Sequence, residues 1–335
     1  MNMYVNKSID SPELKENMSS TVIRIVSPSG FRALLSSSSS QSRVIPIDAS
    51  WYMPNSPFNG KDQFLNEDRI RSAAFFDLDS ICLANSQYPH MLPPYDIFNK
   101  SMTDLGIRRS DTLVVYDKSG IFSSPRAAWN LSLHGHRKVY LLDNYNTYKK
   151  YEYPLETKKT TSLSTPSSDS DIPQYEPISE DDVKENYRNQ VIDYEELLEL
   201  IESGKLDKEY VTFDARSSDR FSGASPEPRP GLSSGHIPSS LSLPFSKVLN
   251  QSDNTYKSKE ELIDLFKQEF GIDFSKPNAT NGKKIIVMCG TGVTAVILRL
   301  ALESVIQCNI PIRVYDGSWT EWAQRAPSQY IIKTK

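Results

Sequence analysis

What this 335-residue sequence lacks excludes several kinds of protein. It has only three cysteines, far apart in the chain, so we expect no disulfide framework and a reducing compartment. No apolar run approaches the roughly 18 residues that span a bilayer, so we expect no membrane segment. Lys and Arg number 38 against 42 Asp and Glu, which makes the net charge −4. This balance does not indicate direct binding of nucleic acid.

The first residues lack the features of a targeting peptide. They include Asp10, Glu13 and Glu16 and have no apolar h-region, unlike a secretory signal or a mitochondrial presequence. We expect residues 1–22 to be a disordered extension and the protein to be cytoplasmic.

Patterns that bind metals are also missing. No C-x-x-C occurs, and none of the four histidines has ligand spacing to a cysteine. His134 and His136 lie beside Gly135, which is more typical of a helix end. We therefore expect neither a metal nor an organic cofactor.

The most informative segment that is present is Cys289-Gly290-Thr291-Gly292-Val293-Thr294-Ala295. It follows an apolar run at 285–288 and precedes an amphipathic run through 305, which predicts a buried strand, a tight loop and a helix. Two glycines let backbone amides converge, and a helix N-terminus adds roughly half a positive charge. This environment favours a thiolate, the nucleophilic form of cysteine. Cys82 and Cys308 lack such a context, so we interpret both as structural.

A nucleophilic cysteine in such a loop transfers either phosphoryl groups or sulfur. Cysteine phosphatases need C-x5-R, in which the arginine clamps phosphate oxygens with two hydrogen bonds. Here Ala295 stands at the position of that arginine. The loop therefore favours sulfur transfer, in which the thiolate carries one extra sulfur atom as a persulfide.

The two halves of the chain resemble each other weakly but in order. Residues 44–50 match 211–216, residues 111–117 match 284–289, and residues 139–143 match 312–316. Nearly constant spacing between these pairs indicates that a whole domain is duplicated. In the first copy Asp117 stands in place of the cysteine, so we expect that domain to be catalytically silent.

Each copy alternates short β-branched runs with helical patterns, which predicts an α/β fold. We expect two tandem domains, each a mainly parallel sheet flanked by helices, at 23–157 and 183–335. Residues 158–182 are rich in Ser, Thr, Pro and acidic residues and cannot bury enough apolar surface to order, so we interpret them as a linker. Capping patterns begin helices at Asp193 and Ser258, and Gly204 and Gly271 end them.

These motifs together resemble the two-domain rhodanese-like sulfurtransferases over nearly all of residues 23–330. The C-G-T-G-V-T-A loop is similar to the C-G-S-G-V-T-A loop of the mercaptopyruvate branch, whereas thiosulfate-preferring members carry basic loop residues. Further matches occur along both copies: Asp48-Ala49-Ser50-Trp51-Tyr52, Phe75-Phe76-Asp77-Leu78-Asp79, Tyr88-Pro89-His90-Met91-Leu92, Gly235-His236-Ile237-Pro238 and Tyr315-Asp316-Gly317-Ser318-Trp319.

The resemblance implies roles for particular residues. Cys289 would carry the persulfide, and Arg220 and Arg229 would bind the substrate. The loop residues Gly290, Gly292, Val293 and Thr294 would cradle the transferred sulfur. A relay of Thr291, His90 and Asp79 would move a proton at the domain interface.

Two positions depart from the family pattern. Thr291 replaces the family's serine; it keeps the hydroxyl and adds a methyl group. Residues 69–72, Arg-Ile-Arg-Ser, replace His-Ile-Pro-Gly, which we expect to alter the local loop and not catalysis.

The resemblance also implies partners. Mercaptopyruvate or thiosulfate would donate sulfur, and thiols such as thioredoxin would accept it. The resemblance is strongest to fungal members that supply sulfur for tRNA wobble-uridine 2-thiolation, which adds mitochondria as a second expected location. The alternative is a sulfur-relay adaptor, loaded by a cysteine desulfurase and acting on a ubiquitin-activating-enzyme-like protein.

Overall fold

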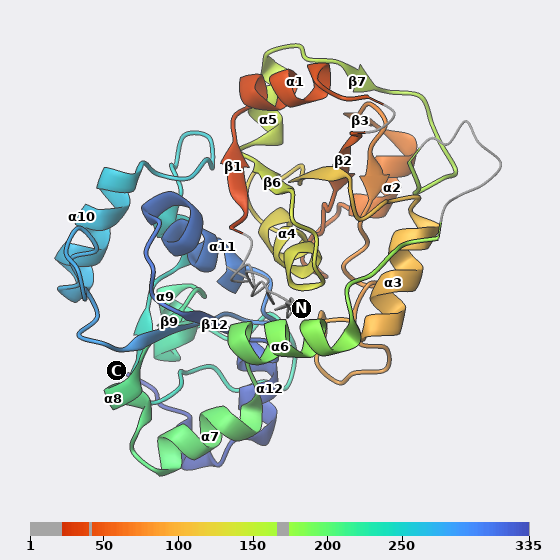
Figure 1. Ribbon diagram of the computed structural model, residues 1–335. Helices are drawn as coiled ribbons and strands as arrows, with labels where there is room; N and C mark the ends of the chain where they lie inside the picture. Colours follow the sequence, from red (N-terminus) through yellow and green to blue (C-terminus); the bar gives the residue numbers. More distant parts are fainter. Residues whose placement is uncertain (1–21, 40–41, 166–173, 335) are drawn as a thin grey trace, which may run out of the picture.

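The computed structural model describes residues 22–39, 42–165 and 174–334, arranged as two α/β units (Figure 1). The expected extension at 1–22 therefore lies outside the described residues except for Val22. The first unit contains, in chain order, β1 (Arg24–Val26), α1 (Pro28–Ser36), β2 (Val44–Asp48), α2 (Gly60–Asn66), β3 (Arg69–Ile70), β4 (Ala74–Phe75), α3 (Tyr95–Asp104), β5 (Thr112–Tyr116), α4 (Ser124–Leu133), β6 (Val139–Leu142), α5 (Tyr145–Lys150) and β7 (Leu155–Glu156).

The second unit follows the same plan. It contains α6 (Glu180–Gln190), β8 (Val191–Ile192), α7 (Tyr194–Glu202), α8 (Leu206–Glu209), β9 (Tyr210–Asp214), α9 (Ser218–Ser222), β10 (Ser240–Ser242), the 3₁₀ turn η1 (Phe245–Val248), α10 (Lys259–Phe270), β11 (Lys284–Met288), α11 (Ala295–Leu300), the π-helical turn η2 (Ala301–Ile306), β12 (Ile312–Tyr315), α12 (Ser318–Arg325) and the 3₁₀ turn η3 (Ser328–Tyr330).

Both units contain a five-stranded parallel sheet with one strand order. The order is β1-β6-β5-β2-β4 in the first sheet and β8-β12-β11-β9-β10 in the second. The strands expected from the three repeated segments therefore occupy equivalent positions, which confirms the duplicated fold. A separate two-stranded antiparallel sheet pairs β3 with β7, and β3 lies inside the segment 69–72 that departs from the family pattern.

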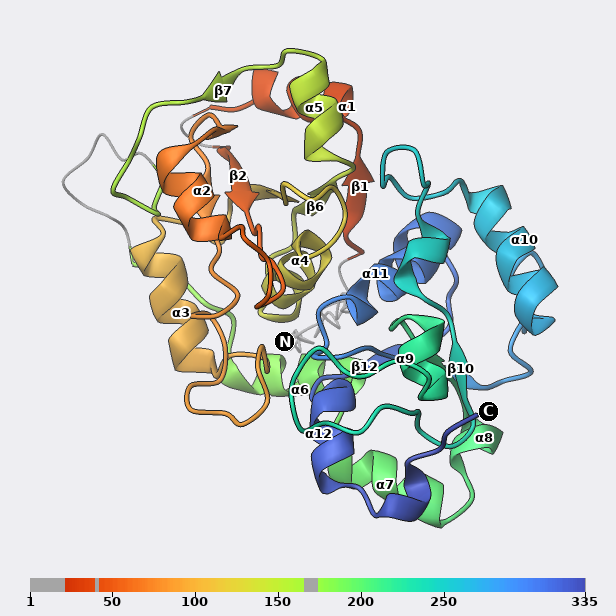
Figure 2. The ribbon, with the colours of Figure 1, turned by 180° about the vertical axis from the view of Figure 1, so that it is seen from behind.

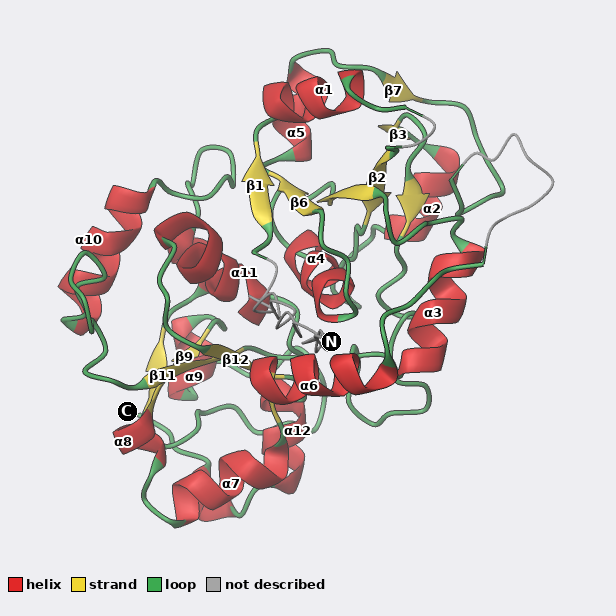
Figure 3. Cartoon of the chain, in the orientation of Figure 1, coloured by secondary structure: helices red, strands yellow, loops and turns green. Residues whose placement is uncertain are grey.

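Helices cover both faces of each sheet (Figure 3). Alternate residues of a central strand pack into different apolar clusters: Leu113 and Val115 of β5 face one cluster, and Val114 and Tyr116 face another. A strand that is buried on both faces is apolar at consecutive positions and does not alternate. The apolar runs in β5 and β11 have this origin.

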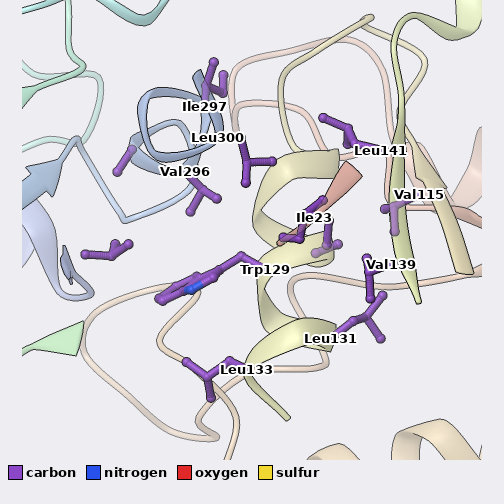
Figure 4. Packing of buried hydrophobic residues seen from close by; sticks show 14 of the residues in the cluster. Ile23, Val115, Trp129, Leu131, Leu133, Val139, Leu141, Val296, Ile297 and Leu300 are labelled. Atoms are coloured by element: carbon purple, nitrogen blue, oxygen red, sulfur yellow. The ribbon is translucent and has the colours of Figure 1, made fainter. Parts of the chain in front are cut away.

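The two units share one apolar core where α4 meets α11 (Figures 2 and 4). Trp129 of α4 lies opposite Val296, Ile297 and Leu300 of α11 in this core. The run after Cys289, expected to be amphipathic, is instead buried all round from Ala295 to Leu302, so that expectation was wrong. The reason is that α4 of the first unit covers the side that would otherwise face water.

Part of the expected linker is ordered and packed. Helix α6 begins at Glu180, inside the range 158–182, and crosses from the first unit to the second (Figure 1). Tyr175 is buried and its hydroxyl contacts His136 Nε2 at 2.8 Å. A few apolar and aromatic side chains anchor this otherwise polar segment, which its overall composition did not predict. Residues 166–173 lie outside the described part.

Helix ends follow the capping patterns of the sequence. Asp193 accepts a hydrogen bond from Glu196 N at the start of α7, and Ser258 and Glu261 form a complete capping box at the start of α10. Gly204 and Gly271 adopt positive φ just beyond the two helices. No helix in the described ranges is both long and apolar enough to cross a bilayer.

Candidate active site

The cysteine loop joins the end of β11 to the start of α11, as the sequence predicts. Cys289 is buried, its N–H donates to Ser318 Oγ at 3.1 Å, and its carbonyl accepts from Trp319 N at 2.9 Å. Thr320 donates from both its N–H and its hydroxyl to the Gly290 carbonyl. The start of α12 thus fixes the first two residues of the loop, which the sequence did not reveal.

Gly292 is required at its position for two reasons. Its φ is +76°, a left-handed conformation that favours glycine. A Cβ atom there would also lie 2.7 Å from the Asp316 carbonyl oxygen and 3.0 Å from Arg126 Nη1. Gly292 therefore faces the domain interface, and it does not line the cavity beside Cys289.

A cavity of about 220 Å³ opens beside the Cys289 thiol. The loop and three arginines form part of its lining: Cys289, Gly290, Thr291, Val293, Thr294, Arg216, Arg220 and Arg229. Large apolar side chains from both units form an apolar wall: Trp51, Met53 and Phe122 from the first and Phe245 from the second. Most of the predicted binding residues are brought together here, whereas the sequence did not assign the apolar wall.

Buried acids hold two of the arginines. Arg216 pairs with Asp214 at 2.6 Å and with Glu227 at 2.7 Å, and all three are buried. Burial alone would lower the pKa of Arg216, but the charges of Asp214 and Glu227 outweigh it and raise the pKa. Arg220 also pairs with Glu227, through Nε at 3.0 Å and through Nη2. Glu227 is therefore a bridge that fixes one predicted substrate arginine.

Arg229 is more loosely held than Arg220. Among the described residues no carboxylate lies within ion-pair distance of its guanidinium, although it lines the cavity. Burial lowers the pKa of Arg229, an effect opposed by the charge of Cys289 and reinforced by Arg220. Arg229 therefore offers its hydrogen-bond donors to a ligand of the cavity.

The three predicted relay residues form one hydrogen-bonded chain across the domain boundary. His90 Nδ1 lies 3.2 Å from Thr291 Oγ1, and His90 Nε2 lies 2.9 Å from Asp79 Oδ1. The hydrogen bond from His90 lowers the pKa of Asp79, helped by Trp51 Nε1, which donates to the same oxygen at 3.1 Å. The Trp51 ring also meets the edge of the buried imidazole. The geometry suits passage of a proton between Thr291 and His90.

The equivalent loop of the first unit is occupied by its own carboxylate. Asp117 Oδ2 accepts hydrogen bonds from the N–H groups of Phe122, Ser123 and Ser124 at 2.9–3.0 Å and from the Ser124 hydroxyl at 2.6 Å. Oδ1 accepts from Ser119 N. The first unit therefore has a carboxylate in place of the thiol, bound by the amides of its own loop.

The remaining thiols and the remaining histidines do not line the cavity. Cys82 Sγ contacts the Asp79 carbonyl, and burial raises the pKa of both Cys82 and Cys308. His134 caps the end of α4, and burial lowers its pKa to about 4. Across the described ranges no three His, Cys, Asp or Glu residues are grouped so that they could hold a metal ion.

Comparison with known proteins agrees with this geometry. The rhodanese-like domain family matches residues 193–325, the second unit. Thiosulfate sulfurtransferase TUM1 of Saccharomyces cerevisiae is 39% identical over 313 residues, covering 93% of this chain and 98% of the relative. Human 3-mercaptopyruvate sulfurtransferase is 35% identical and covers 85% of this chain and 87% of its own length.

Solved structures extend the match to both units. The crystal structure of Tum1 from Saccharomyces cerevisiae has a TM-score of 0.82 at 38% identity, covering 94% of this chain and 99% of that one. The sulfur transferase subunit of yeast mitochondrial complex I has a TM-score of 0.77 at 34% identity, covering 93% and 100%. With full-length relatives above 30% identity and the same two-unit fold, this chain belongs to the rhodanese-like sulfurtransferases and is an enzyme of that family.

Proposed function

We propose that the enzyme moves sulfur from 3-mercaptopyruvate, with thiosulfate as a poorer donor, to a thiol acceptor through a persulfide on Cys289. The observation that carries this proposal is the cavity that joins the Cys289 thiol, two substrate arginines and an apolar wall. A planar guanidinium binds a carboxylate through two parallel hydrogen bonds, and the apolar wall excludes water from the reacting sulfur.

The charge of the arginine cluster supports the choice of donor. Arg216, Arg220 and Arg229 carry three positive charges, and Asp214 and Glu227 cancel two of them. The cluster therefore has a net charge of +1 beside the thiolate. Mercaptopyruvate brings one carboxylate, whereas thiosulfate is a dianion, so the monoanion is better matched.

The reaction is a double displacement. The Cys289 thiolate attacks the sulfur of mercaptopyruvate, a sulfur–sulfur bond forms, and the carbon–sulfur bond breaks. The electron pair leaves on carbon as the enolate of pyruvate, and the proton that was on the donor sulfur ends on that carbon. An acceptor thiol then takes the outer sulfur as its own persulfide and gives its proton up, which restores the Cys289 thiolate.

Thr291 and His90 are the residues that we propose for the proton route. The Thr291 hydroxyl lines the cavity and contacts the His90 ring, and Asp79 holds the far nitrogen of that ring. A positioned acid of this kind contributes about 10²- to 10⁴-fold to a proton transfer. His90 and Asp79 come from the first unit, which gives the catalytically silent domain a part in the chemistry.

Intact mass after incubation with each donor tests the proposal. We expect one added sulfur on the Cys289 peptide, removable by a reducing thiol and accompanied by pyruvate release with mercaptopyruvate. Cys289→Ser should remove the adduct, and Cys308→Ser, which changes a half-buried thiol outside the cavity, should keep it. Persulfide formation by Cys289→Ser protein would contradict the assignment.

We propose that the cell uses the transferred sulfur for tRNA wobble-uridine 2-thiolation, with a protein of that pathway as the acceptor. The resemblance to fungal members supports it, and the net charge of −4 favours a protein intermediary over direct contact with tRNA. Loss of the enzyme should lower 2-thiouridine in tRNA, and wild-type chain but not Cys289→Ser should restore it. Unchanged 2-thiouridine would contradict this acceptor.

The adaptor function is the second candidate, in which a cysteine desulfurase loads Cys289 and a ubiquitin-activating-enzyme-like protein accepts the sulfur. It is favoured by one comparison, the relative described as a subunit of complex I, which acts within a protein assembly. Radiolabelled sulfur transfer from a desulfurase, set against transfer from mercaptopyruvate, separates the two functions.

We propose two locations, the cytoplasm and mitochondria. A plant relative is described as mitochondrial and is 37% identical over 83% of this chain, and the complex I relative is mitochondrial as well. Cell fractionation with an antibody against the native chain would test this, and absence from either fraction would remove that location.

A further inference from the structure

An ion pair outside the cavity links the two units directly behind the relay. Arg126 is the third residue of α4 in the first unit, and Asp316 follows β12 in the second. Arg126 Nη2 lies 2.6 Å from Asp316 Oδ1, and both side chains are almost completely buried. The Trp129 ring packs against the guanidinium with its centroid 4.9 Å away. None of the sequence motifs assigned a role to this pair.

The remaining hydrogen bonds of the pair go to the backbone on both sides of the relay. Arg126 Nη2 donates to the His90 carbonyl at 2.6 Å, and Asp316 Oδ2 accepts from Leu92 N at 2.8 Å. Arg126 Nη1 donates to the Gly292 carbonyl at 3.3 Å, next to Thr291. The pair therefore holds the His90 segment and the Cys289 loop with the same few atoms.

The backbone of His90 needs such support. Its φ is +63°, a left-handed conformation that costs energy for a residue with a side chain and persists only when its surroundings impose it. Arg126 binds the carbonyl of that same residue. Without this contact the peptide can relax, and the imidazole then moves away from Thr291.

We propose that Arg126 and Asp316 are positioning residues that set the distance between His90 and Thr291, and so couple the silent unit to sulfur transfer. The proposal rests on the proton route given under the proposed function. The pair does not touch the cavity, so it acts on the rate of the chemical step through His90 and leaves donor binding unchanged.

The test is a double-mutant comparison on the full chain with mercaptopyruvate. Arg126→Met and Asp316→Asn should each lower kcat by about 10- to 100-fold, the loss that a displacement of roughly 1 Å causes, with KM nearly constant. In a Thr291→Val background, where the relay hydroxyl is already missing, the same changes should lower kcat no further. Arg126→Lys keeps the charge but not the planar fork, so it should recover only part of the rate.

Arg299 provides a matched control. It is another buried arginine, it lies near the same Trp129 ring, and it binds the Ile312 carbonyl and Gln190 without reaching either loop. Arg299→Met should change thermal stability and leave kcat unaltered. If Arg126→Met protein does not fold, Arg126→Lys and Asp316→Asn serve for the same comparison.

Three outcomes would overturn the proposal. One is wild-type kcat in the Arg126 and Asp316 variants. Another is an equal loss with and without the Thr291 hydroxyl, which would make the pair purely structural. The third is a wild-type kcat in Thr291→Val, which would show that the reaction does not need the relay. The Cys289 persulfide would still form in that case, so the proposed sulfur transfer would stand although this inference had failed.

Discussion

Glu227 cancels part of the positive charge of the arginine cluster that we propose binds the donor, so replacing it should change which donor the enzyme prefers. It bridges Arg216 and Arg220 while almost completely buried. Glu227→Gln keeps the shape and one acceptor oxygen but removes a negative charge, so the net charge of the cluster rises from +1 to +2. We expect the variant to accept thiosulfate more readily relative to mercaptopyruvate.

The expected change in donor preference corresponds to the interaction of one unit of charge with Glu227, because thiosulfate carries one more negative charge than mercaptopyruvate. A donor bound to Arg220 lies two hydrogen-bond lengths from Glu227, about 6 Å, and at an effective dielectric constant near 20 the extra charge interacts with about 2.8 kcal/mol. Arg220 is partly exposed, and solvent screening reduces this interaction to about 1 kcal/mol. The ratio of kcat/KM values should then shift about fivefold toward thiosulfate.

The assay is steady-state sulfur transfer to one common thiol, with each donor in turn. Glu303→Gln is the matched control, since Glu303 also pairs with an arginine but lies outside the cavity. An unchanged donor ratio in Glu227→Gln, with the protein folded, would refute the charge-matching explanation. Equal losses for both donors would mean that Glu227 acts only by holding Arg220 in place.

Further predictions concern the relay, the loop and the silent unit. Thr291→Val should lower kcat about 10- to 100-fold while Thr291→Ser keeps it, as seen in pyruvate release; equal rates would exclude a role for the hydroxyl. Gly292→Ala should cost about 2 kcal/mol or more in urea unfolding, because of its positive φ and the close Asp316 carbonyl; an unchanged midpoint would contradict this. Burial raises the pKa of Asp48 to about 6, so the folded protein holds that proton more tightly than the unfolded chain. Its contribution to the free energy of unfolding therefore falls by about 3 kcal/mol as the pH rises from about 4 to about 6. Asp48→Asn should remove this part of the pH dependence, measured by urea unfolding at pH 4, 5, 6 and 7, and an unaltered slope would argue against it.

Short sequence patterns predicted the strands, turns and helix ends that depend on residues close together in the chain. The apolar runs of β5 and β11, the glycines after β11 and the capping residues Asp193 and Ser258 all act within a few residues of the chain. The duplication was also visible, because equivalent strands recur at nearly constant spacing. The Arg-Ile-Arg-Ser segment was expected to change a local loop, and Arg69 there is buried and bonded to the Phe64 and Lys158 carbonyls.

Contacts between distant segments were not predictable from the same patterns. Arg126 and Asp316 are far apart in the sequence, and although Asp316 lies in one of the matched segments, no pattern pairs it with Arg126. Glu227 lies in a Pro-rich loop, where a carboxylate usually faces water, and only the fold places it between two arginines. The burial of α11 depends on a partner helix from the other unit, which no pattern within the run itself can report.

Asp117 has a consequence for the lifetime of the enzyme. Its carboxylate is covalently part of the loop that it fills, so it cannot diffuse away, and oxygen or peroxide cannot oxidise it as they do a thiolate. The loop of the first unit consequently keeps the same charge and shape before, during and after each turnover. In the proposed mechanism, oxidative damage can then stop sulfur transfer at Cys289 while the part of the proposed site that carries His90 stays intact and ready for a reduced thiol.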